Sequence, residues 1–238
     1  MTIFDTHVHT SQVSKCSRIT GKELARLYKK AGYDGIVITD HIVYYYWKEA
    51  MAQNMSWEAF ARNHMEGFLE AKAEGNKIGL KVLYGCELRF NDNSDNDYLV
   101  YGMTNDFLVS NPDVMEWGIK KFSEIAEKNG FLVFQAHPFR NNMVVKNPEY
   151  LFGVEVHNGN PHKEHFERNA FANLWAERFN LKKIAGSDCH IPEQAARAGL
   201  CFYKDVCTEE DFVREVKAQN YMLLENPNPS YTDLTVFD

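Results

Sequence analysis

The chain lacks the features of membrane proteins and of disulfide-rich proteins. None of its apolar runs approaches the roughly 20 residues that a membrane-spanning helix needs, and its first residues do not form a basic segment followed by an apolar one. Its five cysteines are odd in number and contain no C-x-x-C pair, which argues against a disulfide framework and against a zinc ribbon. We therefore expect a cytoplasmic protein with reduced thiols and no membrane contact.

Positive charge is also in short supply. With 26 lysines and arginines against 33 aspartates and glutamates, the formal net charge is -7, and a surface of this sign repels a phosphate backbone. A broad nucleic-acid footprint is therefore not expected, although a local basic patch beside an active site, with a nucleotide as its substrate, stays open. No internal repeat, low-complexity segment or linker interrupts the sequence, so we expect a single domain over residues 1–238.

The sequence is rich in alternating strand and helix patterns. Short β-branched and aromatic runs alternate with longer amphipathic stretches, which is typical of repeated strand–helix units around a mainly parallel sheet. Thr20 with Glu23 predicts a capping box at the start of one helix, and Asn111 before Pro112 predicts the start of another. The number of strands favours a barrel over a small open sheet. The predicted strands are 2–7, 35–39, 81–87, 98–102, 131–136, 153–157, 183–187 and 199–203.

Side chains that bind metals recur where the predicted strands end. His7 and His9 form an H-x-H, and strand alternation places both rings on one face. The other candidates end later strands, and in a β/α barrel such ends converge on one mouth. Each alone would more often be a cap or a satisfied polar residue, but together they indicate a metal site whose mixed ligands suit Zn, Mn or Fe. The candidates are His7, His9, His41, Glu87, His137, Asp188 and His190.

The order of these motifs resembles that of a known family. H-x-H, T-D-H, a strand-end Glu, H-P and S-D-x-H follow one another as in the PHP (polymerase and histidinol phosphatase) domain family, from Phe4 to Arg197. The resemblance implies a distorted (β/α)7 TIM-like barrel of the α/β class and a metal-dependent phosphoesterase with two or three divalent ions. It further implies a first ion on His7, His9, Glu87 and Asp188, a second on Glu87 and His137, and a third on His41 and His190.

The implied chemistry needs groups beyond the metal ligands. Two ions bridged by Glu87 would share one hydroxide that attacks phosphorus in line. Asp40, beside His41, is expected to orient a ligand or to act as an acid behind the ligands. Planar arginines suit the phosphate group itself. The candidates are Arg140, which follows His137 by three residues, then Arg197, and after these Arg18 and Arg89.

Two departures from the family pattern concern the number of ions. The loop of residues 10–17 offers no imidazole or carboxylate where family members usually supply a ligand, so the third site is incomplete unless Cys16 or water fills it. After the predicted strand 98–102, Met103 and Thr104 stand where some members have a histidine. His157 is a candidate replacement, with a hydrogen-bonded structural histidine as the alternative.

Three function classes follow from these residues. The first is a phosphoesterase for a small phosphorylated metabolite or a nucleotide, which the arginines at the mouth favour. The second is an amidohydrolase-like enzyme, since the same barrel and metals can cleave amide or cyclic C–N bonds. The third is a non-catalytic, metal-stabilised module. The aromatic segment after His41, residues 44–47, is expected either to pack in the core or to form a wall of the site.

Overall fold

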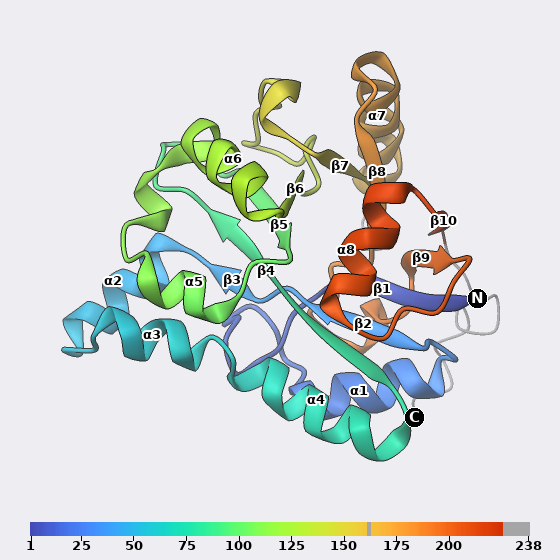
Figure 1. Ribbon diagram of the computed structural model, residues 1–238, viewed down its shortest axis with the longest axis horizontal. Helices are drawn as coiled ribbons and strands as arrows, with labels where there is room; N and C mark the ends of the chain where they lie inside the picture. Colours follow the sequence, from blue (N-terminus) through green and yellow to red (C-terminus); the bar gives the residue numbers. More distant parts are fainter. Residues whose placement is uncertain (161–162, 226–238) are drawn as a thin grey trace.

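The fold is a barrel of seven strands, seen in a computed structural model that describes residues 1–160 and 163–225 (Figure 1). The strands are hydrogen-bonded in the order β1-β2-β4-β5-β6-β7-β8, and an isolated bridge between Val8 and Cys189 brings the two ends of this sheet together. The predicted TIM-like α/β barrel is thereby confirmed. The bounds are β1 Thr2–Val8, β2 Gly35–Ile38, β4 Lys81–Arg89, β5 Asp97–Tyr101, β6 Leu132–Gln135, β7 Gly153–Asn158 and β8 Lys182–Gly186.

The barrel departs from a regular parallel arrangement in two places. β5 runs antiparallel to both β4 and β6, so its first residue, not its last, lies at the mouth. On the free edge of β1 lie two further antiparallel strands, β9 (Ala198–Phe202) and β10 (Tyr221–Glu225). The predicted strand 199–203 is thus outside the barrel, and β10 was not predicted. The short β3 (His41–Ile42) pairs with β4 at Glu87.

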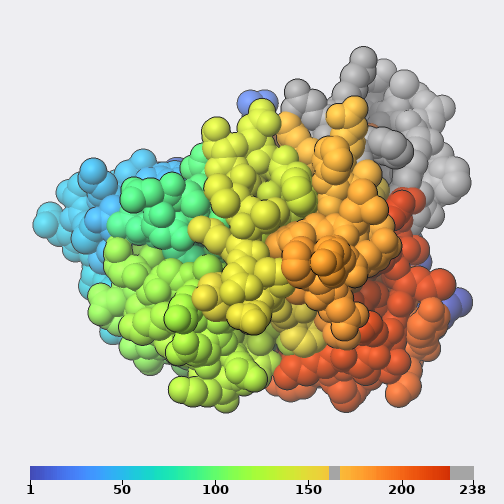
Figure 2. Space-filling model, turned by 90° about the horizontal axis from the view of Figure 1, so that it is seen from above, coloured from blue at the N-terminus to red at the C-terminus, as the bar shows by residue number. Residues whose placement is uncertain are grey.

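Helices cover the outside of the barrel. α1 and α4 lie side by side against β2 and β4, and α7 lies beside β7 and β8 (Figure 1). Seen from above, α6 and α7 occupy the near face, with the α2–α3 region at one end (Figure 2). The bounds are α1 Gly21–Lys30, α2 Tyr44–Ala52, α3 Trp57–Asn63, α4 Glu66–Ile78, α5 Asn105–Ser110, α6 Gly118–Asn129, α7 Lys163–Phe179 and α8 Glu209–Ala218, with short 3-10 turns η1 Val114–Glu116, η2 Pro148–Tyr150 and η3 Pro192–Gln194.

The helix-start predictions met different outcomes. Thr20 caps α1 with the predicted box, since its hydroxyl accepts from the Glu23 N–H at 3.2 Å. The prediction for Asn111 was wrong: this residue ends α5, and its amide donates to the Phe107 carbonyl. A 3-10 turn follows before α6 begins at Gly118. No helix among the residues described is long and apolar enough to cross a membrane.

An aromatic plug closes the end of the barrel where the parallel strands begin. It consists of Phe4, Tyr101, Phe202 and Phe212, all buried. The Phe212 ring of α8 lies 5.0 Å from Tyr101, 5.5 Å from Phe202 and 6.5 Å from Phe4, measured between ring centroids. Tilted and edge-on pairs of this kind add to the gain from burying apolar area. The site therefore rests on a rigid hydrophobic floor.

Candidate metal centre

The predicted ligands converge at the opposite end of the barrel, its mouth. Four sets of atoms that could bind a metal each lie within 4.8 Å of one another, and three of the sets consist of predicted ligands alone: His7, His9 and Asp188; His7, Glu87 and His137; and His9, His41 and His190. These residues lie on β1, β3 and β4 and in the segments that follow β1, β6 and β8. The structure therefore brings together all seven side chains that the sequence singled out.

Glu87 lies at the centre of the cluster. Its Oε1 is 3.0 Å from His137 Nε2 and 3.4 Å from His7 Nε2. Its Oε2 is 2.9 Å from His41 Nδ1 and 3.4 Å from His9 Nε2. A carboxylate with one oxygen facing each of two imidazole pairs has the arrangement of a bridging metal ligand. Asp188 Oδ1 faces the same gap, 3.4 Å from both His7 Nε2 and His9 Nε2.

Several donor atoms in the cluster have no hydrogen-bond partner. They are His7 Nε2, His9 Nε2, His41 Nδ1 and Glu87 Oε2, all buried. The 2.9 Å approach of His41 Nδ1 to Glu87 Oε2 does not have hydrogen-bond geometry. Buried polar atoms are almost always paired, and an unpaired one costs about 1–3 kcal/mol. Inward-facing nitrogen and carboxylate atoms of this kind fit a divalent cation, which would satisfy all of them at once.

Hydrogen bonds on the far side of the rings fix their tautomers. His7 Nδ1 donates to Glu155 Oε1 at 2.8 Å, which leaves the lone pair on Nε2. The Ser14 hydroxyl donates its proton to Asp40 at 2.7 Å, so His9 Nδ1, 3.2 Å from that oxygen, must be the donor to it. Both rings are therefore oriented with Nε2 toward the centre, where a bound ion would take the place of a proton on that nitrogen.

The charges of the cluster depend strongly on one another. Burial opposes charge on His7, but the carboxylates of Glu155, Asp188 and Glu87 outweigh it and hold the pKa of His7 well above its usual value. Burial likewise opposes ionisation of Glu87, but His7 and His41 bring its pKa well below the usual range. The pKa of His9 is well below its usual value because of burial and of the neighbouring His190 and His41. Glu87 is thus held in its ionised form by the imidazoles around it, and a divalent ion between them would replace their protons as its partner.

The backbone at the mouth is strained where two candidate ligands attach. His137 has a φ of 27° and Asp188 a φ of 53°, a region that residues other than glycine rarely adopt. Strain of this kind gathers at functional sites, where the surroundings hold it in place. Gly186, just before Ser187 and Asp188, has to be glycine because a Cβ there would lie 2.4 Å from the His7 Cβ.

Asp97 is a further acid at the mouth that the sequence reading missed. It begins β5, is buried, and groups with His41 and Glu87 within 4.8 Å. Arg89 donates to both of its carboxylate oxygens at 2.7 Å, so this arginine is occupied by Asp97. Met103 and Thr104, where some family members have a histidine, lie at the other end of the barrel because β5 is antiparallel.

The other predicted site residues lie at different distances from the centre. Arg140 reaches it, with Nη2 2.5 Å from Asp188 Oδ2. Arg197 donates instead to the Glu193 carbonyl at 2.7 Å. Asp40 accepts from the Thr10 N–H, the Thr10 hydroxyl and the Ser14 hydroxyl, and burial raises its pKa to about 6. Asp40 thus acts through the loop that follows β1 and does not face the gap.

Residues beside the cluster bear on two of the open alternatives. His157 Nδ1 is 3.3 Å from the Asn169 amide of α7, in keeping with the structural reading, and it joins none of the ligand groups found in the described part of the chain. The aromatic segment is divided between its two readings. Tyr46 packs edge-on to His41, with 6.5 Å between ring centroids, whereas Trp47 packs on Trp57. Tyr46 and His41 line a pocket of about 260 Å3 beside the cluster.

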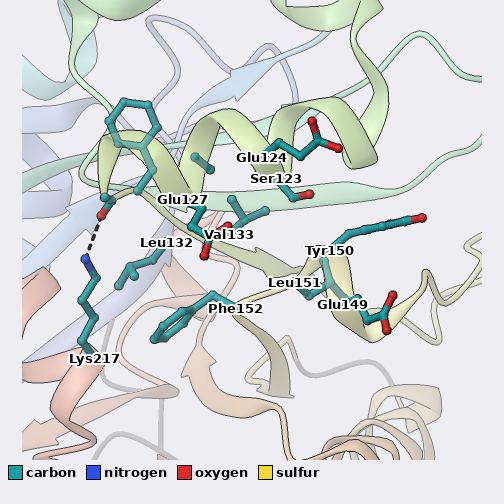
Figure 3. A pocket seen from close by; sticks show the side chains of 13 residues that line it. Ser123, Glu124, Glu127, Leu132, Val133, Glu149, Tyr150, Leu151, Phe152 and Lys217 are labelled. Carbon is teal, nitrogen blue, oxygen red and sulfur yellow. Dashed lines mark hydrogen bonds between the residues drawn. The ribbon is translucent and has the colours of Figure 1, made fainter.

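A larger pocket of about 500 Å3 lies elsewhere, between α6, the segment 149–152 and α8 (Figure 3). Its cation Lys217 is bonded to the Gly130 carbonyl at 3.2 Å, and Glu124, Glu127 and Glu149 also line the pocket. None of the predicted site residues lines this pocket. Its acidic rim is unsuited to a phosphate, so the smaller pocket at the mouth is the one to consider for the chemistry.

Comparison with known proteins identifies the family. The model of the PHP domain matches residues 5–187, and that of the PHP-associated segment matches residues 166–221. Because the first match covers more than half of the 238 residues, the chain belongs to the PHP domain family. No curated protein matches the sequence.

Solved structures share the fold at low sequence identity. PsfC from Pseudomonas syringae PB-5123 has a TM-score of 0.68 and 18% identity, over 99% of this chain and 95% of that one. A two-domain protein from Bacteroides vulgatus ATCC 8482, containing a predicted PHP-like metal-dependent phosphoesterase, has a TM-score of 0.64 and 18% identity over 94% of this chain, which spans 65% of its length. An amidohydrolase from Chromobacterium violaceum, with bound sulfate and no metal, has a TM-score of 0.54 and 14% identity, over 95% of this chain and 99% of that one.

Proposed function

We propose that this protein is a metal-dependent phosphoesterase that hydrolyses a small phosphorylated metabolite or a nucleotide. The observation that carries the proposal is the set of buried, unpaired donor atoms around Glu87, with a guanidinium at their edge. Unpaired nitrogens and carboxylates fit divalent ions, and an adjacent arginine fits the phosphate that such ions would polarise. An amide substrate would bring no anionic group to the donors of this arginine that Asp188 does not occupy.

Some residues of the centre would bind the ions directly, and others would hold those ligands in position. His7, His9, Glu87 and Asp188 would hold one ion, and Glu87 with His137 a second, with Zn, Mn or Fe as the metals suited to these donors. Bound divalent ions supply an activated water and neutralise charge on the phosphoryl oxygens. Glu155 fixes the ring of His7 through the 2.8 Å hydrogen bond, and it also accepts from the His137 N–H at 3.0 Å.

We expect Arg140 to bind the substrate phosphate. Its Nη2 contacts the Asp188 oxygen Oδ2, whereas Oδ1 faces His7 and His9. A phosphate bound at the ions would therefore come within reach of the remaining donors of the guanidinium, whose side chain is 31% exposed. Arg197 would join it only by leaving the Glu193 carbonyl. The small pocket between His41 and Tyr46 would take the leaving group.

A screen with defined metals tests the proposal. Protein loaded with Zn or Mn is assayed against phosphomonoesters, phosphodiesters and amides, with elemental analysis of the same sample. We expect hydrolysis of a phosphoester and at least two ions per chain. Hydrolysis of amides alone would favour the amidohydrolase alternative, and bound metal without any turnover would favour the non-catalytic module.

A further inference from the structure

Two polar residues of β7, Glu155 and Asn158, are buried at the mouth although they lie three positions apart in the sequence. In a regular strand, residues at this spacing point to opposite faces of the sheet. The pairing of β7 with β8 shifts its register between Glu155 and His157, and an irregularity of this kind re-aims the side chains that follow it. Both side chains can therefore face the metal centre, and they are 1% and 2% exposed.

The side-chain amide of Asn158 joins two carboxylates of the mouth. Its Nδ2 donates to Glu155 Oε2 at 3.0 Å and to Asp188 Oδ2 at 3.3 Å. Its Oδ1 accepts from the Asn160 N–H at 3.1 Å. Because a backbone N–H can only donate, the amide oxygen must face Asn160 and the amide nitrogen must face the carboxylates. Both protons of the nitrogen are thus used on acids of the metal centre.

The main chain of Asn158 is fixed from the outside of the barrel by α7. The Asn158 N–H donates to Asn169 Oδ1 at 3.0 Å, and Asn169 Nδ2 donates to the Asn158 carbonyl at 3.1 Å. The next residue, Gly159, donates its N–H to the Gly186 carbonyl at 2.9 Å, two residues before Asp188. These bonds set the position of the amide relative to the segment that carries Asp188.

Asp188 receives two donors on the same outer oxygen. Its Oδ2 is 2.5 Å from Arg140 Nη2 and 3.3 Å from Asn158 Nδ2. Its Oδ1 faces the gap, 3.4 Å from the Nε2 atoms of His7 and His9. The Arg140 side chain is 31% exposed and can meet a substrate, whereas Asn158 is 2% exposed. Only Asn158 therefore offers Asp188 a donor for which a bound substrate does not compete.

We propose that Asn158 is a positioning residue of the metal centre, which holds the outer oxygen of Asp188 so that Arg140 can bind a phosphate without releasing Asp188 from its ion. The inference rests on the metal centre of the proposed function. The same amide also holds Glu155, whose other oxygen fixes the ring of His7 at 2.8 Å. One buried side chain thus supports Asp188 directly and His7 through Glu155. Hydrogen bonds of this kind to metal ligands contribute about 10- to 100-fold to metal affinity.

Mn(II) affinity of chelator-stripped protein, measured by calorimetric titration without substrate, tests this role. Wild type is compared with Asn158→Ala, Arg140→Ala, the double variant and Asn220→Ala. Asn220 is the matched control, because its amide donates at 2.8 Å to the buried carboxylate of Glu215 on α8, the helix of the plug. We expect wild-type affinity in Arg140→Ala and Asn220→Ala, and an affinity about 10- to 100-fold lower in Asn158→Ala.

The double variant separates positioning from a general loss of structure. With both donors removed, Asp188 Oδ2 has neither of its partners, so the loss of affinity should exceed the product of the two single losses. A general loosening of β7 would instead lower the affinity by the same factor with or without Arg140. A double variant that binds Mn(II) no more weakly than Asn158→Ala would therefore overturn the proposal.

Unchanged Mn(II) affinity in folded Asn158→Ala would overturn it as well. Circular dichroism establishes folding, and Asn158→Val, which keeps a strand-forming side chain without a donor, gives the same measurement if the alanine variant does not fold. The phosphoester screen reports separately on the proposed function. The expected pattern of affinities without phosphoester hydrolysis would leave the role of Asn158 standing and remove the proposed activity. Hydrolysis by wild type with unchanged affinity in Asn158→Ala would do the reverse.

Discussion

The two ends of the barrel both contain fully buried side chains, but one end is apolar and the other is polar. The side chains of the plug, Phe4, Tyr101, Phe202 and Phe212, are buried, and their rings pack against one another. At the mouth, His7, His9 and Glu87 are also 0% exposed, yet each has a side-chain nitrogen or oxygen atom without a hydrogen-bond partner. Burial alone therefore does not separate core from site. What separates them is whether the buried polar atoms are satisfied.

This difference indicates that the plug stabilises the fold, whereas the mouth lowers the stability of the fold. Burying apolar area at the plug stabilises the fold by about 25 cal/mol for each Å2. Grouping buried acids and imidazoles at the mouth costs desolvation, which ion pairing only partly returns. Two strained residues, His137 and Asp188, add to that cost. We expect changes at the mouth to affect function first and changes at the plug to affect folding first.

The largest effect is expected from Glu87→Gln. The amide keeps the shape of the side chain but removes the charge that would bridge two ions, so metal content should fall and hydrolysis should drop about 1000-fold or more, which corresponds to several kcal/mol of transition-state stabilisation. Elemental analysis and phosphoester kinetics measure both. Unchanged metal content would contradict the bridging role.

Phe212→Ala should lower stability and leave metal binding unchanged, the opposite of what is expected for Glu87→Gln. Removing a buried aromatic side chain from the plug leaves a cavity and should lower the free energy of unfolding by about 3–5 kcal/mol. Because the mouth lies at the other end of the barrel, the fraction that stays folded should keep the metal content of wild type. Urea denaturation and elemental analysis provide the measurements. A loss of metal from the folded protein would show that the two ends are coupled.

The residues of the mouth were predicted from the sequence only in part. The ligands at the mouth were predicted because His7, His41, Glu87 and Asp188 stand at recognisable strand ends, and parallel strands bring such ends together. Asp97 was missed because nothing in the residues of β5 reveals that this strand runs antiparallel. The partnership of Glu155 with His7 was missed because it joins β7 to β1, across the barrel. Contacts between distant strands depend on register, which the local pattern does not encode.

Arg140→Ala tests the edge of the mouth, where a charged side chain is only partly buried. Losing a charge-assisted contact to a phosphate should cost about 1.5–3 kcal/mol, or about a 10- to 150-fold loss of kcat/KM. Metal content should not change, since Arg140 contacts the outward oxygen of Asp188. Arg197→Ala is the matched comparison and should have a smaller effect. Full activity of Arg140→Ala on a phosphoester would mean that the phosphate is bound elsewhere.

The smallest effect is expected from His64 and concerns the pH dependence of stability. This imidazole is buried beside the mouth, and both of its ring nitrogens have hydrogen-bond partners. Its Nε2 lies 3.0 Å from the Asp40 carbonyl and its Nδ1 2.9 Å from the Tyr84 hydroxyl, so a neutral ring donates on one side and accepts on the other. Burial lowers the pKa of His64 from 6.5 to about 4, against the Asp40 carbonyl, which raises it, and with the nearby His41, which lowers it further.

The sign of the pH effect follows from these two pKa values. The unfolded chain takes up a proton at His64 below pH 6.5, whereas the folded chain does so only near pH 4, so this contribution to stability is complete above pH 6.5 and is lost as the pH falls toward 4. Between pH 7 and 5 the loss should be about 2 kcal/mol. His64→Gln lacks this titration, so urea denaturation at both pH values should show wild type losing about 2 kcal/mol more than the variant. The histidines of the metal centre are present in both proteins, so their contribution cancels in the comparison. Equal losses would mean that His64 takes up its proton at the same pH in the folded and the unfolded chain, so that burial does not lower its pKa.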